Sequence, residues 1–384
     1  MHAGLDGPGE ALRGLFATRP YSHLPDMRRR FVISLLAVAA VAAASLTCSP
    51  IYVLRAGYEE AKILSRRRPI PEVIEDAATR DVIRDKLRLV LQARNYAARV
   101  LDLNAGDSFT TYSWVDSDTL LLVLSAARKD RFEPYTWWFP IVGRVPYKGY
   151  FDFDDAHAEA RRLDERGYDT HVRPSAAFST LGWFNDPVLN TVLRYGDVDL
   201  AQTVIHELTH NTIYISGQAA FNESFATFVG DRGAAAFLCE IDGADGERCR
   251  VATDAWHDTM RFGAFLQQLV ERLEALYAQE LPLDTVLARR SELYLQAQEE
   301  WRRTHVPQLR TGAFAGYFDR PLNNAILIGS RLYYQRLDVF EAVYQQHGQD
   351  LRRAAQVIEE AARSRENDPF GAVADLLAAP VHGE

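Results

Sequence analysis

The stretch from Thr203 to Gly230 reads TVIHELTHNTIYISGQAAFNESFATFVG, and the interpretation of the whole chain depends on it. It holds two histidines four residues apart, His206 and His210, with Glu207 directly after the first. Because residues four apart lie on one face of an α-helix, both imidazole rings can reach a single ion. Glu207 then faces an open coordination position, where it can take a proton from a water molecule on the metal. The stretch predicts a zinc site on a helix.

The residues on either side of this motif support a helical pair. The preceding LAQTVI is apolar at helix spacing, and Gly217 interrupts the helix that follows it. A second helix starts with FNESFATFVG and places Glu223 near its beginning. A glutamate there supplies the third ligand of a two-histidine, one-glutamate catalytic zinc site. The alternatives are that Glu223 only favours the helix dipole, or that the whole motif is a structural helix without metal.

Length and composition limit the class of protein. A chain of 384 residues, one quarter of them charged, can bury a large core. The formal net charge of -9 argues against a nucleic-acid partner, and the sequence has no Gly-rich phosphate loop. We expect a globular protein with no nucleic-acid partner.

The pattern along the chain predicts an α+β fold. An N-terminal helical segment at 48–104 precedes a strand-like region at 105–187, where SFTTYSWV, TLLLVLSAA, TWWFPIVG and THVRPSAAF are rich in Thr, aromatic and branched residues. One helical pattern, DAHAEARRLDERG, interrupts these strands. Residues 188–384 are largely helical. We therefore expect a small mixed β-sheet region followed by a largely helical body, together forming one domain at 105–384.

The first 47 residues predict export. Three arginines follow Met27, and an uncharged apolar run then extends from Phe31 to Thr47, which is the plan of an export signal. We expect translation to start at Met27. The sequence SLTC, ending at Cys48, resembles a lipoprotein signal and predicts a lipid anchor there. An uncleaved N-terminal anchor and cleaved secretion are the alternatives, and all three place the body outside the cytoplasm.

Two further cysteines bracket a Gly/Asp-rich loop, CEIDGADGERC, between Cys239 and Cys249. An oxidising compartment would let them close as a disulfide. Two unpaired thiols are the alternative.

Several motifs together resemble a known family. HELTH with NESFATFVG is similar to gluzincin zinc metallopeptidases, and TWWFPIVGRVPYKGYFD, FSTLGWFNDPVLN and RPLNNAIL resemble a bacterial family of aminopeptidases that are usually lipoprotein-like. The likeness runs from about Ile51 to near the end of the chain. It implies a zincin-like body built around the HExxH helix and a peptide substrate.

The resemblance also implies roles for individual residues. His206, His210 and Glu223 become zinc ligands, and Glu207 becomes the general base and acid. Gluzincins often use a Tyr or His from a later helix to stabilise the oxyanion, and SRLYYQ offers two candidates, Tyr333 and Tyr334. We assign this role to Tyr334.

The likeness to membrane alanyl aminopeptidases is partial. FNESFA resembles their NEGFA segment, but their Gly-Ala-Met-Glu-Asn substrate strand is missing. No carboxylate that would hold a free substrate amine is identified.

Other polar residues have weaker signals. Thr209 and Asn211 are candidates for supporting the zinc ligands, although surface contacts fit them better. Asn323 and Asn324 suit helix capping as well as ligand contact. The segment with Gly182 and Trp183 suits an edge strand for an extended peptide or a buried strand and turn. We predict that other histidines, such as His157, His171 and His257, are surface residues.

The function expected from the sequence is that of a zinc-dependent peptidase of the bacterial cell envelope, most simply an aminopeptidase. Manganese or cobalt would suit the same ligands in vitro. A zinc endopeptidase and a non-catalytic, zinc-bound lipoprotein that binds peptides are the alternatives. Glu207 favours an enzyme, because a binding protein has no need of a carboxylate beside an open metal position.

Overall fold

The computed structural model describes Tyr58 and residues 61–116, 119–139, 143–175 and 187–378. All of them belong to one compact unit, Leu54–Glu384. The predicted start at Met27, the export signal, Cys48, Gly182 and Trp183 lie outside the described residues. Among the helices of the described part, none combines the length and the apolar character needed to cross a bilayer.

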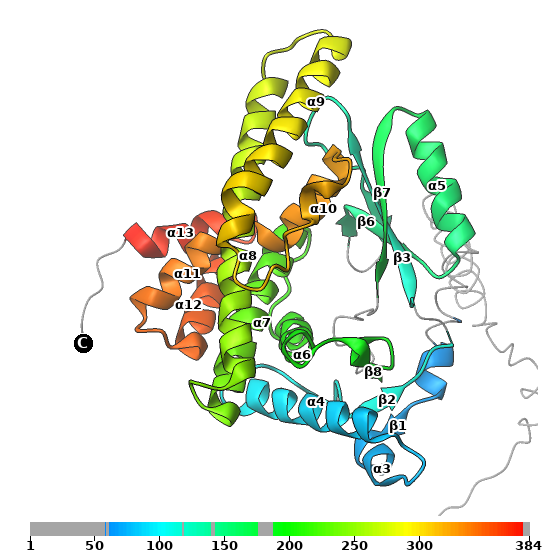
Figure 1. Ribbon diagram of the computed structural model, residues 1–384, viewed down its shortest axis with the longest axis vertical. Coiled ribbons are helices and arrows are strands. Elements are labelled where there is room, and N and C mark those ends of the chain that lie inside the picture. The colour runs from blue at the N-terminus through cyan, green and yellow to red at the C-terminus, as the bar shows by residue number, and fades with distance from the viewer. Residues whose placement is uncertain (1–57, 59–60, 117–118, 140–142, 176–186, 379–384) are drawn as a thin grey trace, which may run out of the picture. The chain divides into compact units, whose positions relative to one another are not determined.

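The main sheet is antiparallel, with strand order β6-β3-β7. Its central strand β3 (Leu121–Arg128) pairs with β6 (Tyr147–Tyr150) and with β7 (Tyr168–Ser175). Helix α5 (Phe153–Glu165) covers one face and helix α10 (Asn324–Tyr334) covers the other (Figure 1). Because both faces are covered, β3 is buried along almost its whole length, and this explains its uninterrupted apolar sequence.

A second, smaller sheet consists of three short strands that lie far apart in the sequence. Strand β2 (Thr111–Ser113) pairs antiparallel with β1 (Arg68–Pro69) and parallel with β8 (Val188–Leu189). Both partner strands lie in ranges that the sequence predicts to be helical. Each is only two residues long, which is too short for side-chain periodicity to reveal.

The segment TWWFPIVG, expected to be one strand, contributes to two. Strands β4 (Trp137–Phe139) and β5 (Gly143–Val145) pair antiparallel with each other. Gly143 has a φ of 76°, a backbone conformation that favours glycine where β5 begins.

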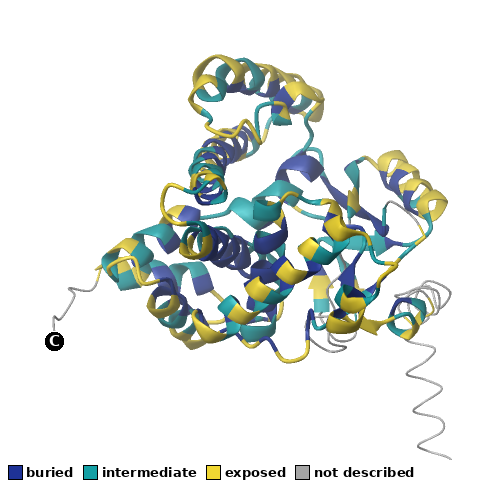
Figure 2. Ribbon diagram, turned by 60° about the horizontal axis from the view of Figure 1, so that its bottom comes forward, coloured by how far each residue is buried: buried dark blue, intermediate teal, exposed yellow. Residues whose placement is uncertain are grey.

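Three helices form the centre of the helical body. Helix α6 (Asp197–Thr212) packs against α7 (Ala219–Asp242), and α7 packs against α8 (Glu247–Tyr277). Helix α7 is the most deeply buried of the three, and its residues from Ser224 to Gly230 are buried without interruption, so this stretch is covered on all sides. Figure 2 shows the buried residues gathered on the inner helices and the exposed residues along the outer faces.

Two glycines let α6 and α7 approach closely. A Cβ atom at Gly230 would lie 3.1 Å from the Cβ atom of His206, and one at Gly233 would lie 3.0 Å from Ile205. Side chains at these positions would push α7 away from the helix that carries the HELTH motif. The two small residues therefore help to set the distance between the predicted zinc ligands.

The other helices surround this centre. They are α3 (Ile70–Glu75), α4 (Asp81–Arg99), α9 (Leu283–Glu300), α11 (Leu337–Gln346), α12 (Leu351–Ser364) and α13 (Pro369–Ala378). The short elements are η1 (Val192–Arg194), a π-helical continuation of α9 (Trp301–His305), η3 (Val306–Gln308) and η4 (Tyr317–Asp319). The predicted α+β class is confirmed: small sheets accompany a mainly helical chain.

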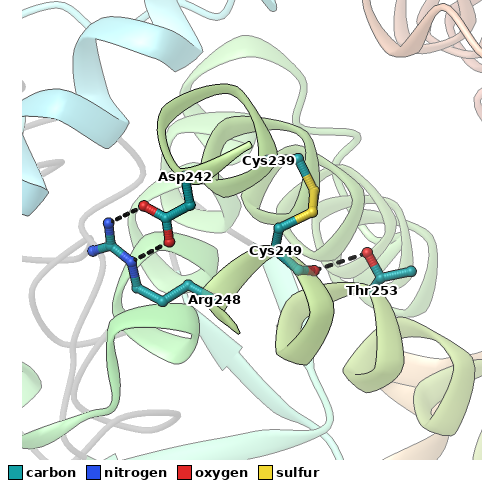
Figure 3. Close-up of a disulfide and its surroundings, with 5 residues drawn as sticks. All are labelled: Cys239, Asp242, Arg248, Cys249 and Thr253. Carbon is teal, nitrogen blue, oxygen red and sulfur yellow. Dashed lines mark hydrogen bonds and ion pairs between the residues drawn. A yellow bond between two sulfur atoms is a disulfide. The ribbon is translucent and has the colours of Figure 1, made fainter. Parts of the chain in front are cut away.

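A disulfide closes the turn between α7 and α8 (Figure 3). Cys239 and Cys249 are bonded, with their Cα atoms 4.4 Å apart. Beside them, Arg248 donates from Nε to Asp242 at 2.8 Å, and the Thr253 hydroxyl donates to the Cys249 carbonyl at 2.9 Å. The predicted disulfide is confirmed, and the alternative of two unpaired thiols is wrong.

Candidate metal centre

The turn between α6 and α7 is held by one side chain. Gly217, with a φ of 78°, lets the chain reverse after the HELTH helix. The Asn222 amide accepts a hydrogen bond from the Ile215 N–H at 3.0 Å and donates one to the Ile215 carbonyl at 2.8 Å. This pair of bonds fixes the loop against the start of α7, where Glu223 is the next residue.

The three predicted ligands meet at one point. Oε2 of Glu223 lies 3.4 Å from Nε2 of His206 and 3.6 Å from Nε2 of His210. The candidate ligand atoms of the three residues lie within 4.8 Å of one another. Their side chains are nearly buried, with exposed fractions of 10%, 6% and 14% for His206, His210 and Glu223.

These distances fit a tetrahedral metal. They are longer than an ordinary N–H···O hydrogen bond. Zinc bonds of about 2.0–2.1 Å at tetrahedral angles would separate neighbouring ligand atoms by about 3.4 Å. The donor set, two imidazoles and one carboxylate, is also the one that zinc accepts in catalytic sites. The residues present therefore fit the ion.

The three side chains influence one another's titration. Burial by itself would raise the pKa of Glu223, but the imidazoles of His210 and His206 outweigh it and hold this pKa well below its usual value. Burial would lower the pKa of His210, and the carboxylates of Glu223 and Glu207 raise it above its usual value. Glu223 is thus a carboxylate at neutral pH.

Three buried polar atoms of the HELTH motif have no hydrogen-bond partner among the described residues. Among the described residues, Glu207 Oε2, His206 Nδ1 and His210 Nδ1 are buried and make no hydrogen bond. The atoms of His206 and His210 that converge on Glu223 are the Nε2 atoms, so of these three only the Glu207 oxygen bears on the chemistry of the centre. Glu207 acts electrostatically on both His210 and Tyr333, so its carboxylate faces the centre. It has an oxygen available to accept a proton.

The two candidate tyrosines point to different places. The Tyr333 ring stacks over the His206 ring, with centroids 6.2 Å apart and planes at 25°. The Tyr334 ring packs edge-on against Phe262 at 4.9 Å and against Phe314 at 5.7 Å, within an aromatic core. Tyr334, to which the sequence analysis assigned the oxyanion role, therefore does not fit it. Tyr333 is the tyrosine beside the ligands.

Ser224 links the motif to the helix that carries these tyrosines. Its hydroxyl donates to the Leu332 carbonyl at 2.9 Å and accepts from the Gln335 N–H at 3.0 Å. Both contacts lie at the end of α10, on either side of Tyr333 and Tyr334. Asn222 thus fixes the loop and Ser224 fixes α10, and the predicted ligand Glu223 lies between them.

Three residues near the centre have no signal in the sequence. Arg173 on β7 donates from Nη2 to the Tyr333 hydroxyl at 3.3 Å. Tyr147 on β6 and Tyr214 after α6 both have raised pKa values, because of burial first and then the charge of Glu223. The alternation of side chains along a strand places Arg173 on one face of β7, but it does not show that Tyr333 lies on that side.

The remaining candidates lie elsewhere. Thr209 donates to the Ile205 carbonyl of its own helix, and Asn211 donates to the Ser108 hydroxyl. Asn323 caps α10 by accepting from the Ile326 N–H. Asn324 accepts from two tyrosine hydroxyls in the core, those of Tyr277 and Tyr294.

His171 departs from the prediction of a surface residue. It is only partly exposed, and burial, with Arg320 and Arg173, lowers its pKa to about 4.

One comparison with known proteins identifies the family. Residues 51–368 match the model of the family described as "Putative aminopeptidase", so the chain belongs to that family. The family's description suggests peptidase activity. No curated protein and no solved structure matches the chain.

Proposed function

We propose that this protein is a zinc-dependent peptidase, in the first place an aminopeptidase, of the bacterial cell envelope. One observation carries the proposal: the ligand atoms of His206 and His210 on α6 and of Glu223 on α7 lie within 4.8 Å of one another. Glu207, next to His206 on α6, has a buried oxygen without a partner among the described residues. Membership of the aminopeptidase family supports the same class of reaction.

In this proposal His206, His210 and Glu223 hold the ion. When bound, zinc supplies a Lewis acid that activates water near neutral pH and polarises a carbonyl group. The close approach of α6 and α7 at Gly230 keeps the ligands at this spacing. The low pKa of Glu223 keeps its carboxylate charged and ready to bind a cation.

Glu207 moves the proton. Its unpartnered Oε2 accepts a proton from the attacking water and later gives it to the leaving amine. A glutamine at this position would keep the shape of the side chain and lose the proton acceptor.

Tyr333 donates to the oxyanion. A guanidinium has only N–H donors, so the Tyr333 oxygen accepts in its bond with Arg173. The Tyr333 O–H therefore remains free to donate elsewhere, and its ring lies over His206. A donor placed in advance beside the reacting carbonyl stabilises the developing negative charge.

The envelope location rests on the sequence and on the disulfide. The basic and apolar run before Cys48 supports export, and the Cys239–Cys249 bond suits an oxidising compartment. Mass spectrometry of the mature N-terminus would find a diacylglyceryl group on Cys48. An unmodified chain that still begins at Met27 would contradict the lipid anchor.

The activity is tested with the full-length chain in detergent. Hydrolysis of free aminoacyl substrates, but not of N-blocked peptides, is the expected result, and a chelator should abolish it until zinc is restored. Cleavage of N-blocked peptides would identify an endopeptidase instead. Zinc binding without hydrolysis of any peptide would favour the peptide-binding alternative.

A further inference from the structure

Arg173 occupies a defined place beside the metal ligands. It lies on β7 opposite Val123 of β3, and its side chain contacts Tyr333 of α10, which stacks over His206. Its guanidinium donates a hydrogen bond to the Tyr333 hydroxyl. Within the described part of the chain, no carboxylate forms an ion pair with it.

Several other partly buried arginines have carboxylate partners, whereas Arg94 donates to the backbone carbonyls of Ser108 and Gly106. Arg290 binds Asp169 at 2.6 Å, Arg232 binds Glu341, and Arg248 binds Asp242 and Asp197. A half-buried guanidinium without a counter-ion is costly, because it loses part of its hydration without compensation. Arg173 has no such partner among the described residues, and it lies beside Tyr333, next to the proposed metal ligands.

A second arginine adds charge of the same sign. The Arg320 guanidinium lies 4.8 Å from the centroid of the Tyr317 ring, and among the described residues it too pairs with no carboxylate. His171 and Arg173 are two residues apart on β7, so their side chains lie on the same face of the sheet. The charges of Arg320 and Arg173 both contribute, after burial, to lowering the pKa of His171.

The carboxylates beside the centre are already committed. Those that act on Tyr333 are Glu223 and Glu207, the first a ligand and the second the proposed base. The charged group that remains to bind a substrate is therefore the Arg173 guanidinium, which is a cation. Its natural partner is an anion, and a guanidinium binds carboxylates with two parallel hydrogen bonds.

We propose that Arg173 binds a carboxylate of the substrate, so that preferred peptides carry a negative charge close to the scissile bond. This inference rests on the proposed peptidase function and names its substrate class. The carboxylate has two sources: an acidic side chain after the scissile bond, or the free C-terminus of a dipeptide. Both present the same group to Arg173.

Two matched substrate pairs separate the sources. Ala-Glu-amide against Ala-Gln-amide tests the acidic side chain, and Ala-Ala against Ala-Ala-amide tests the free C-terminus. We expect wild-type kcat/KM to favour the carboxylate member of one pair by about tenfold or more, since a hydrogen bond to a charged group is worth that much. Arg173→Gln should bring the ratio close to one, and Arg173→Lys should keep part of it.

The ratio within a pair is the decisive readout. If Arg173 only positioned Tyr333, Arg173→Gln would slow both members of each pair equally and leave the ratio unchanged. That result, or a wild-type ratio near one in both pairs, would overturn the proposal.

A binding measurement keeps this test separate from the peptidase proposal. The four peptides are titrated calorimetrically into full-length Glu207→Gln protein loaded with zinc, with and without Arg173→Gln. Tighter binding of a carboxylate member that is lost with Arg173 supports the inference even when no peptide is hydrolysed. Equal binding of all four peptides would contradict it, whether or not the wild-type protein is active.

Discussion

The α6–α7 pair and the β7–α10 pair both contribute to the centre, but they do so in different ways. His206, Glu207, His210 and Glu223 come from one continuous stretch, and Asn222 holds the loop between their helices. Arg173 and Tyr333 come from positions 160 residues apart and meet only because α10 covers the sheet. The first pair provides the proposed metal ligands and base, whereas the second surrounds them with a donor and a positive charge.

We therefore assign the catalytic chemistry to the α6–α7 pair and the selectivity for substrate to the β7–α10 pair. The α6–α7 hairpin sets the distances between the proposed metal ligands, because Gly230 and Gly233 allow α7 to lie close to α6. The second pair depends on the packing of the sheet, and Ser224 is the side chain that ties it to the motif. Changes in the first pair should abolish activity, while changes in the second should reduce or redirect it.

The largest effect is expected for Glu207→Gln. Losing the general base should lower kcat by about a thousandfold, within the usual range for acid–base catalysis, while zinc content stays unchanged. Steady-state kinetics with elemental analysis measures both. The exposed Glu292→Gln serves as control. Full activity in Glu207→Gln would contradict the assignment of Glu207 on α6 as the general base.

Tyr333→Phe tests the β7–α10 half. Loss of one oxyanion donor should lower kcat by about a hundredfold with little change in KM. Tyr334→Phe is the matched control, because its ring packs in the aromatic core against Phe262. A larger loss of kcat in Tyr334→Phe than in Tyr333→Phe would return the role to Tyr334.

Ser224→Ala should weaken the link between the two halves. Two backbone groups, the Leu332 carbonyl and the Gln335 N–H, would lose their partner, at a cost of about 2–3 kcal/mol in the free energy of unfolding. Denaturant unfolding measures this change. The exposed Ser291→Ala, whose hydroxyl bonds within its own helix, should change stability little. Equal stability of the two variants would show that Ser224 does not hold α10.

The smallest effect concerns His171 and pH. Burial, Arg320 and Arg173 lower its pKa to about 4 in the folded protein, below the unfolded value of 6.5. Between these values the unfolded chain binds a proton that the native state does not, so stability falls as pH falls from 6.5 towards 4.

His171→Gln should remove this contribution. The free energy of unfolding of the wild type should therefore fall by about 1–2 kcal/mol more than that of the variant over this pH range, a value reduced because the side chain is partly exposed. Thermal unfolding at pH 7 and pH 4.5 measures it, with the exposed His157→Gln as control. Identical pH dependence in His171→Gln and the wild type would contradict the burial of this imidazole.

Much of the α6–α7 half was predictable from the sequence. His206 and His210 lie four residues apart, and Gly217 followed by a second apolar pattern indicated where Glu223 would return. The strand-rich region was also recognisable, because β3 is long and apolar. Short strands such as β1 and β8 were not, since two residues carry no periodicity.

The β7–α10 half was not predictable in the same way. Tyr333 and Tyr334 are neighbours on one helix and point about 100° apart, so the packing of α10 decides which of them meets His206. Arg173 needs both the register of β7 and the position of α10 before it can be placed next to Tyr333. Information of this kind lies in long-range packing and not in a local pattern.

The most direct test of the central claim is the metal content of the full-length chain in detergent, measured by elemental analysis and native mass spectrometry. We predict about one zinc ion per chain, as in catalytic zinc sites with two histidines and one glutamate. We also predict loss of that zinc in His210→Ala, with the exposed His157→Ala retaining it. Zinc-free wild-type protein that does not take up the metal, or full zinc content in His210→Ala, would contradict the claim.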